Sequence, residues 1–229
     1  MSPRKPAVLR DGDGQNLREY LIATAARLIG ERGSAGLAVR DITREAQVAD
    51  GVLYNYFEDK EDLLAHALLA HVGSVMQAAP QMPPAGTGTV AENLRLFIDL
   101  GLQTLAQVAP AFAGLASQPG VLSRFHAMVG GDEAFVGGEQ QAGPDPAAGG
   151  PRGLPDILRG YLLAEQRLGR IDPAADVGAA VTLIVGTIHG EILPRVLFAP
   201  PGSRITAAPG LAGRVSETIL RGIAGEPAR

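Results

Sequence analysis

The stretch from Asp41 to Lys60, DITREAQVADGVLYNYFEDK, decides how the rest of the chain is interpreted. Its pattern predicts two short helices, from about Val39 to Ala46 and from about Asp50 to Tyr56, joined by a tight turn at residues 47–48. The second helix has Leu53 to bury, but most of its other residues are polar or small. A helix with a narrow buried side and a polar outer side is typical of the recognition helix of a helix-turn-helix, which enters the major groove of DNA.

The outer side of this second helix carries residue types that suit contact with DNA. Gly51 lets the backbone approach base edges or phosphates, Asn55 can bind adenine through two hydrogen bonds, and the hydroxyls of Tyr54 and Tyr56 can reach phosphate. Lys60 adds a positive charge at the start of the next helix. The residues predicted from this pattern to contact DNA are Asp50, Gly51, Val52, Tyr54, Asn55, Tyr56 and Lys60. The alternative is a small helical bundle whose tyrosines are half-buried.

The composition describes an ordinary globular chain. Its 229 residues carry a formal net charge of −4, so any DNA binding must depend on a local patch and not on a global basic field. There is no Cys, which excludes disulfides and thiolate metal sites. The N-terminal residues lack the apolar run of a secretory signal, and the longest uncharged apolar stretch, residues 177–190, has 14 residues. We therefore expect a soluble, cytoplasmic protein without a membrane partner.

Helical patterns and breaks predict two domains. Residues 1–14 are expected to form a flexible tail, or alternatively a basic arm that reaches a minor groove. Residues 15–79 are predicted to hold the helix-turn-helix between a first helix, residues 15–32, and a fourth helix that Asp59 caps. Prolines at positions 80, 83 and 84 mark the boundary to a second domain, residues 80–229.

The second domain also shows only helical patterns. Residues 130–155 hold eight Gly and four Pro and are predicted to be a flexible loop. The predicted helices are residues 90–108, a short helix opened by Pro110, residues 121–129, residues 156–168, a helix from Asp172-Pro173 to Phe198 with a bend at Pro194, and residues 211–224. The predicted fold class is therefore all-α.

At this point the residues show a family resemblance. The segment VRDITREAQVADGVLYNYFEDKEDLL, with its G-x-L-Y-x-Y-F-x-x-K-E-x-L run, resembles the DNA-binding domain of the TetR family of bacterial one-component transcriptional regulators. The resemblance implies that Gly51 and Asn55 face bases, that Tyr54, Tyr56 and Lys60 face phosphate or the groove, and that two arginines of the preceding helix lie near the DNA backbone. Those two residues are Arg40 and Arg44.

The chain also departs from the family pattern. Ala38 and Ala49 stand where the family usually has a Ser or Thr hydroxyl, and Asp50 adds an acid where a base is common. Residues 1–79 hold nine Lys and Arg against eleven Asp and Glu. Because phosphate contacts supply much of the affinity for DNA, we expect modest affinity that depends strongly on salt.

The resemblance further implies a homodimer in which the last two long helices of each subunit form a four-helix bundle. Small residues at helical spacing, together with an apolar stripe on the last helix, support this prediction independently. The predicted dimer residues are Ala179, Thr182, Gly186, Gly190, Val215, Ile219 and Ile223. A two-fold dimer would match a palindromic operator. The alternative is that both faces are covered within one subunit.

Regulation in the family implies a small effector that binds among the helices of the second domain. The candidate lining is mostly apolar, which suits a lipophilic effector of a repressor. Its residues are Phe97, Gly101, Phe112, Phe125, His126, Tyr161, Leu162 and His189. The alternative for the aromatic residues is an ordinary core position, and for the two histidines a core or surface position. The alternatives are an activator, or a regulator whose second domain only dimerises.

An enzyme is the competing class, and the sequence argues against it. Residues 86–91, GTGTVA, match a dinucleotide-binding pattern formally, but no predicted strand precedes them. The chain has no G-x-S-x-G and no H-E-x-x-H motif, and His66 and His71 are five residues apart, off a shared helix face. We predict no catalytic residue, no metal and no cofactor.

Overall fold

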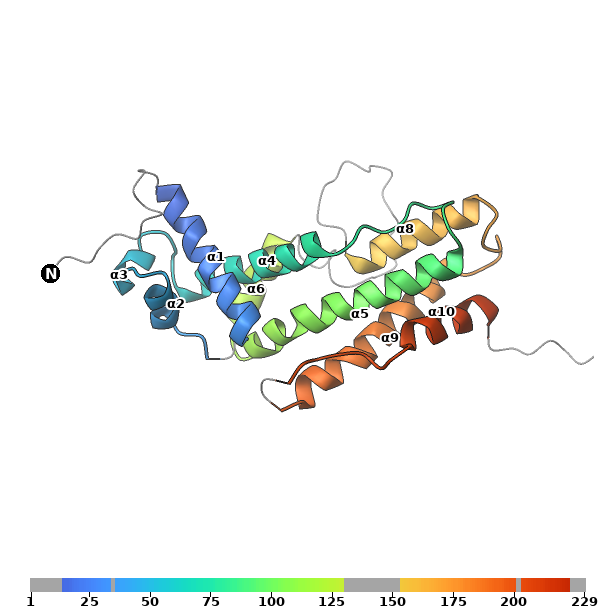
Figure 1. The fold of residues 1–229 in the computed structure, drawn as a ribbon. Coiled ribbons are helices and arrows are strands. Elements are labelled where there is room, and N and C mark those ends of the chain that lie inside the picture. Colours follow the sequence, from blue (N-terminus) through green and yellow to red (C-terminus); the bar gives the residue numbers. More distant parts are fainter. Residues whose placement is uncertain (1–13, 34–35, 130–152, 201–202, 223–229) are drawn as a thin grey trace, which may run out of the picture. The chain divides into compact units, whose positions relative to one another are not determined.

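The computed structural model describes residues 14–33, 36–129, 153–200 and 203–222 (Figure 1). Within these residues the chain forms helices, turns and extended connections without a strand, which confirms the predicted all-α class. The chain divides into two compact units, residues 1–78 with 107–132 and residues 79–106 with 133–229. The helix-turn-helix lies in the first unit.

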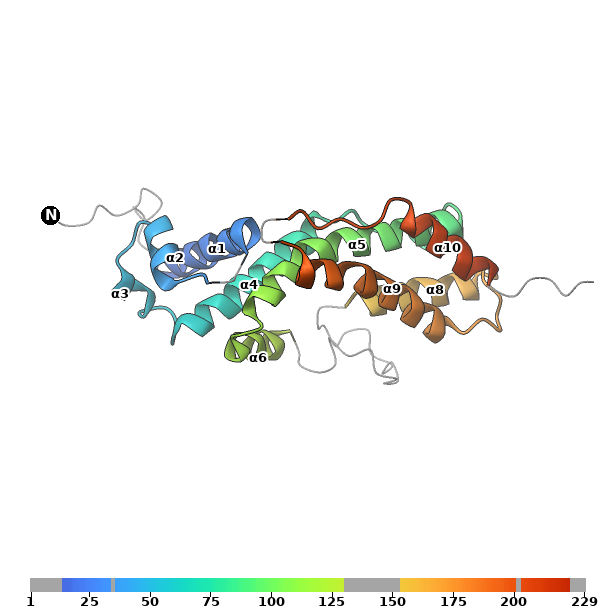
Figure 2. The ribbon, with the colours of Figure 1, turned by 90° about the horizontal axis from the view of Figure 1, so that it is seen from below.

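The first unit is built around two long helices. α1 (Gly14–Arg32) packs along α4 (Lys60–Ala78), while α2 (Val39–Glu45) packs on α1 and α6 (Pro119–Met128) packs on α4 (Figures 1 and 2). Their common core is mostly apolar and contains Leu21, Leu28, Ile42, Leu53, Leu64 and Leu68. This core holds α2 and the short α3 (Asp50–Leu53) at the surface.

The start of α4 is attached to α6 by charged groups. Asp59 accepts the N–H of Asp62 at 2.8 Å, and the two terminal nitrogens of Arg124 donate to its two oxygens, each at 2.8 Å. The backbone hydrogen bond and the bond from Arg124 lower the pKa of Asp59. Gly120 faces Glu61 so closely that an added Cβ would lie 2.0 Å from a carboxylate oxygen. A residue with a side chain at this position of α6 would therefore require the Glu61 carboxylate to move.

One helix crosses a proline that was predicted to divide it. α5 runs without interruption over Val90–Leu115, although Pro110 was predicted to open a separate helix. Pro110 removes one backbone donor, but Ala109, Ala111 and Leu115 around it are buried, and this packing holds the helix together. Residues 107–115 and α6 belong to the first unit, whereas the sequence division at residue 80 placed them in the second domain.

The second unit contains the first part of α5 together with α8 (Leu154–Arg167), α9 (Val177–Phe198) and α10 (Leu211–Arg221). α8 packs on α9, and the Ser216 hydroxyl of α10 donates to the Ala91 carbonyl of α5 at 3.0 Å. The core of this unit is formed by Leu94, Phe97, Ile98, Leu158, Leu162, Ile184, Ile188 and Ile192.

The start of α9 was predicted wrongly. The pair Asp172-Pro173 forms a turn in which Asp172 accepts the N–H of Ala174, and α9 begins at Val177. Asp176 caps it by accepting the N–H of Ala179 at 2.9 Å. The helix then continues through Pro194 to Phe198.

The length of the apolar helices also corrects a sequence argument. By length and composition alone, α5 and α9 are each long and apolar enough to cross a membrane. The prediction considered only a stretch of 14 residues, and α9 extends beyond that stretch to Phe198. Both helices contribute buried side chains to the core, as the core helices of water-soluble proteins also do.

Candidate nucleic-acid interface

The turn between α2 and α3 sets the position of the candidate interface. The N–H of Val48 donates to the Thr43 carbonyl at 2.9 Å, and Gln47 adopts a left-handed conformation with φ of 57°. Ile42 and Leu53, one from each helix, are fully buried. The turn and these two anchors fix α3 against the first unit and leave its other sides at the surface.

α3 is shorter than predicted. It ends at Leu53, and Tyr54 to Tyr56 continue as a turn in which Asn55 N–H donates to the Val52 carbonyl and Tyr56 N–H to the Leu53 carbonyl. The physical reason is that Phe57 is buried, so the backbone must turn inward to bring this ring into the core. Part of the predicted recognition helix is therefore a tight turn.

The predicted contact residues lie on the surface to different degrees. Asp50, Gly51, Tyr54 and Asn55 are exposed, and the Tyr54 residue is 59% exposed. Val52, Tyr56 and Lys60 are half-buried. No protein atom lies within 4 Å of a Cβ built on Gly51, so the space beside this glycine is open.

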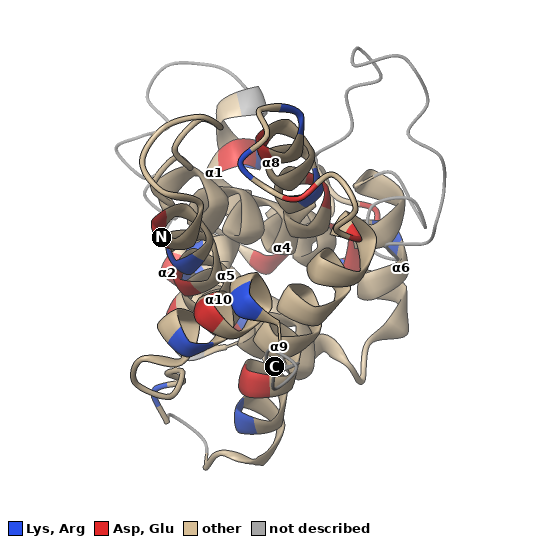
Figure 3. Cartoon of the chain, turned by 90° about the vertical axis from the view of Figure 1, so that its right-hand side faces the viewer, with Lys and Arg blue, Asp and Glu red and all other residues tan. Residues whose placement is uncertain are grey.

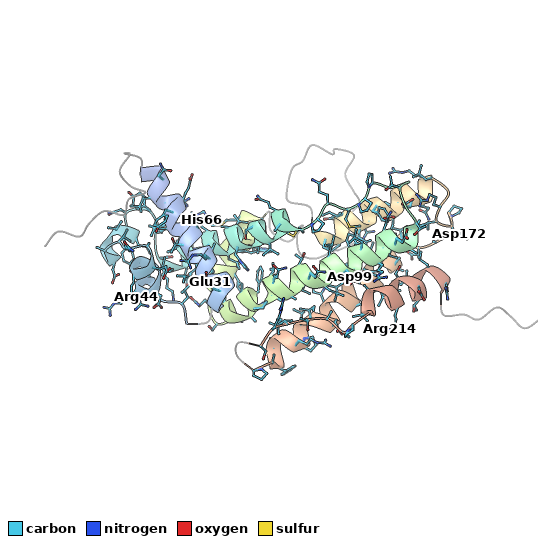
Figure 4. All side chains as sticks on the ribbon, in the orientation of Figure 1. Glu31, Arg44, His66, Asp99, Asp172 and Arg214 are labelled. Atoms are coloured by element: carbon cyan, nitrogen blue, oxygen red, sulfur yellow. The ribbon has the colours of Figure 1, made fainter. Side chains whose placement is uncertain are left out.

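The two arginines of α2 are paired with acids in this state. Arg40 Nε lies 3.5 Å from Asp50 Oδ2. Arg44, which is labelled in Figure 4, donates from Nη2 to Asp41 Oδ1 at 2.8 Å. Asp41 also accepts the N–H of Ala38 at 3.0 Å, which supplies half of a capping interaction. These exposed pairs stabilise little in water. Each arginine nevertheless lies beside an acid, and that acid would compete with a DNA phosphate for its positive charge.

Two of the side chains in these contacts were not identified from the sequence. Thr43 is buried and donates its hydroxyl to Asp50 Oδ1 at 2.5 Å. The spacing of seven residues across a turn gives no local signal for this contact. The pairing of Asp41 with Arg44 was readable, because residues three apart on a helix are neighbours.

A second cluster supports the corner between α3 and α4. Arg18 of α1 donates to Nε2 of His66 at 2.7 Å, and its guanidinium lies 5.1 Å from the centre of the Phe57 ring. Burial lowers the pKa of His66 and the charge of Arg18 lowers it further, while Asp62 opposes the shift. The cluster therefore requires a neutral histidine.

Residues 21–67 match the model of a family described as bacterial regulatory proteins, tetR family. The part of the chain that contains the helix-turn-helix is thus similar to the DNA-binding domain of this family. The HTH-type transcriptional repressor NemR of Escherichia coli is 27% identical over 90 residues, which are 39% of this chain and 45% of that protein. The match thus spans less than half of this curated relative. The TetR match itself is confined to the N-terminal domain.

Solved structures extend the likeness to the whole fold. The fatty acid degradation regulator FadR of Bacillus halodurans is similar with a TM-score of 0.57 and 19% identity, over 93% of this chain and 98% of that one. FadR of Bacillus subtilis, solved in complex with stearoyl-CoA, has a TM-score of 0.54 and 22% identity, over 90% and 99% of the two chains. The similarity in fold to these two regulators therefore extends over both units.

The residues predicted to line an effector site are divided between the two units. Phe112 and Phe125 pack edge to face in the first unit with ring centres 5.2 Å apart, and His126, which follows Phe125 on α6, is half-buried. Phe97, Tyr161 and Leu162 are buried in the second unit.

Two members of this set have different surroundings from those expected of a pocket. A Cβ on Gly101 would lie 2.7 Å from Ile188 Cδ1 and 3.2 Å from Leu154 Cδ2, so side chains fill the space beside this glycine. His189 is exposed, and its Nδ1 contacts the Val185 carbonyl at 2.8 Å. It lies on a different side of α9 from the buried Ile188.

The predicted dimer residues of α9 all lie on its exposed side. Ala179, Thr182, Gly186 and Gly190 are exposed, and a Cβ on either glycine would meet no atom within 4 Å. This α9 face also carries large exposed apolar side chains, beside the exposed His189: Leu183, Leu193, Leu197 and Phe198. α9 contains two charged residues, Glu191 and Arg195, so most of its ribbon is uncharged in Figure 3. On α10, Val215 and Ile219 are half-buried, and Ile223 lies outside the described residues.

A buried polar cluster in the second unit was also missed. Glu165 is fully buried; its Oε1 accepts the N–H of Gly86 at 3.2 Å, and its Oε2 lies 3.4 Å from Arg170. Arg170 also donates to the Gly88 carbonyl. Burial raises the pKa of the neighbouring Tyr161 to about 12, so its phenol stays protonated. Glu165 falls four residues after Tyr161 on the buried side of α8, a spacing that was available in the sequence.

Proposed function

We propose that this protein is a cytoplasmic transcriptional repressor that binds a palindromic DNA operator as a homodimer and is released by a small lipophilic effector. DNA binding is supported most directly by the exposed side of α3, where Gly51 opens to solvent between Asp50 and the exposed Tyr54 and Asn55. The match to the tetR family model includes this segment, and the curated relatives that match it are HTH-type regulators.

The open space at Gly51 gives a direct test. Gly51→Ala adds one methyl group that meets no protein atom, so the fold should tolerate it. If α3 enters the major groove, the methyl group meets DNA instead, and affinity for the upstream region of the protein's own gene should fall at least about 10-fold.

Gly73→Ala is the matched control, because Gly73 lies inside α4 and also has no atom within 4 Å of an added Cβ. Binding is measured by fluorescence anisotropy over a range of salt concentrations. Equal affinity of both variants, or no salt-dependent binding by the unmodified protein, would exclude α3 as the DNA-reading element.

The homodimer is supported by the exposed apolar α9 face. In a monomer, Leu183 and Leu197 would leave 61% and 65% of their surface in water. The open glycines Gly186 and Gly190 allow a second helix to approach closely. We expect the protein to have twice the mass of one 23.7 kDa chain in solution.

Gly190→Glu tests this assignment by placing a charge in the contact. It should give monomers, whereas Gly160→Glu, which adds the same group at an equally open position of α8, should leave the dimer intact. Sedimentation equilibrium distinguishes the two results. A Gly190→Glu protein that remains dimeric would place the contact elsewhere.

The effector proposal depends on the buried aromatic group of the second unit. Phe97, Tyr161 and Leu162 form an apolar interior in which the Tyr161 hydroxyl and Glu165 provide polar atoms. The similar FadR of Bacillus subtilis was solved with stearoyl-CoA, and this supports a ligand with a long apolar chain.

Stearoyl-CoA and stearate are suitable probes, with coenzyme A alone as the control. Either lipid should raise the melting temperature and release DNA, and Tyr161→Phe should weaken that response. If the chain binds DNA but none of these compounds changes binding, a regulator whose second domain only dimerises becomes the better description. The side chains that fill the space at Gly101 are the observation that favours this second possibility.

A further inference from the structure

We propose that Asp50 makes this protein select a base with an exposed amino group, preferably cytosine, at one position of each operator half-site, and that Thr43 positions the Asp50 carboxylate for this role. The proposal rests on the proposed DNA-binding function. It concerns the specificity of that function and not its existence.

The carboxylate of Asp50 is held in one orientation at the surface. Asp50 is the first residue of α3, and 52% of its side chain is exposed. Oδ1 accepts a hydrogen bond from the Thr43 hydroxyl at 2.5 Å, and Oδ2 lies 3.5 Å from Arg40 Nε. Because the residues at the start of a recognition helix contact base edges, this acid is placed where sequence is read.

The hydrogen bond from Thr43 is well defined chemically. Thr43 is 1% exposed, and its hydroxyl oxygen also lies 3.1 Å from the Val39 carbonyl. A hydroxyl has only one proton, and an ionised carboxylate is the stronger acceptor, so the proton is directed to Asp50. The buried threonine cannot move away easily, and the carboxylate is therefore fixed before DNA arrives.

The chemistry of an ionised carboxylate decides which base it prefers. A carboxylate only accepts hydrogen bonds, and the donors of the major groove are the amino groups of cytosine and adenine. Adenine presents its acceptor N7 beside the amino group, which repels the second carboxylate oxygen, whereas cytosine presents no such acceptor. Guanine and thymine offer acceptors to a protein at this edge. Cytosine is therefore the best partner.

Arg40 reduces the unfavourable effect of an acidic side chain at a surface that faces DNA. Its guanidinium beside Asp50 offsets part of the repulsion between the carboxylate and nearby phosphates. A merely structural role for Asp50 would be to stabilise the start of the helix, but α3 has only four residues and so has little dipole to stabilise.

The test is selection from a pool of randomised DNA duplexes by the full chain. The unmodified protein should enrich a two-fold symmetric site with cytosine at one position of each half, preferred at least about 5-fold over other bases. Asp50→Asn should shift that position toward adenine, since an amide can bind adenine through two hydrogen bonds. Asp50→Ala should leave it without preference, and all other positions should be unchanged.

Two further variants complete the design. Thr43→Val keeps the shape of the buried side chain but removes its hydroxyl, and should weaken the preference at the same position only. Glu58→Gln removes one acid from an exposed side chain of the same unit, outside α3, and should leave base preferences unchanged while raising affinity for all sequences.

The results separate the two proposals. If the unmodified protein enriches no sequence, the DNA-binding function itself is wrong. If it enriches an operator and Asp50→Asn or Asp50→Ala changes affinity without altering any base preference, DNA binding stands and the selective role of Asp50 is overturned. The same holds if the unmodified protein prefers guanine or thymine where the Asp50 variants change the preference.

Discussion

The exposed sides of α3 and α9 differ in the polar groups that they present to solvent. On α3 and its following turn, Asp50, Tyr54 and Asn55 are exposed and carry polar groups. On α9, Thr182 donates to the Gly178 carbonyl and Thr187 to the Leu183 carbonyl, so the hydroxyls are used within the helix. The first surface retains hydrogen-bonding groups for a partner, and the second offers mainly apolar contact. This difference is what nucleic acid and a second protein chain respectively require.

The largest expected effect concerns the buried anchor of α3. Leu53→Ala removes a fully buried side chain, and the cavity should lower the free energy of unfolding by about 3 kcal/mol. Urea unfolding followed by circular dichroism measures this change. A loss below about 1 kcal/mol would mean that α3 is not held by the core as described.

The same substitution on α9 should act on association instead. Leu183→Ala removes an exposed side chain from both copies in a two-fold contact, and dimer dissociation should become about 10- to 100-fold easier. Sedimentation at several protein concentrations measures this effect. The stability of the dissociated chain should stay unchanged, and a loss like that of Leu53→Ala would break the comparison between the two helices.

A smaller effect is expected at the turn that presents α3. Gln47 has a φ of 57°, a conformation that costs a residue with a side chain about 1 kcal/mol or more and costs glycine nothing. Gln47→Gly should therefore raise the free energy of unfolding by about 0.5 kcal/mol, after the greater freedom of glycine in the unfolded chain is deducted. Thermal unfolding of the variant and the unmodified protein measures this difference. A less stable variant would contradict the claim that Gln47 is strained.

The smallest expected effect is a dependence of the free energy of unfolding on pH, which arises from the partly buried His66. Burial and Arg18 lower the pKa of His66 below the ordinary 6.5, so the unfolded chain takes up this proton first as the pH falls. The contribution to stability is therefore complete above pH 6.5 and is lost as the pH falls below it, through the folded pKa.

His66→Gln should remove this part of the pH dependence, because glutamine can accept the hydrogen bond from Arg18 without titrating in this range. The comparison is made by urea unfolding at pH 5 to 8. An identical pH profile for the variant would assign the change to another group.

Local rules predicted the features that depend on local spacing. Leu53 was identified as the buried residue of its short helix, and Gly51, Tyr54 and Asn55 were expected on the outer side. These predictions need only the period of a helix.

The features that were missed depend on competition between distant contacts. Pro110 obeys a rule for helix interruption, but buried neighbours override it. Asp172 and Asp176 are both acceptable caps, and spacing alone cannot choose between them. The bond between Thr43 and Asp50 forms across a turn, so neither residue signals it alone.

The glycine turn at residues 86–89 has a consequence for what this chain can bind. Such turns in other proteins direct backbone N–H groups toward a phosphate, but here the N–H of Gly86 is satisfied by the protein's own Glu165, with Arg170 alongside. Glu165 therefore occupies the position of an internal counter-anion. In a Glu165→Ala chain the Gly86 N–H and Arg170 would lose this acidic partner, and we expect that variant to bind small anions more tightly than the native chain does.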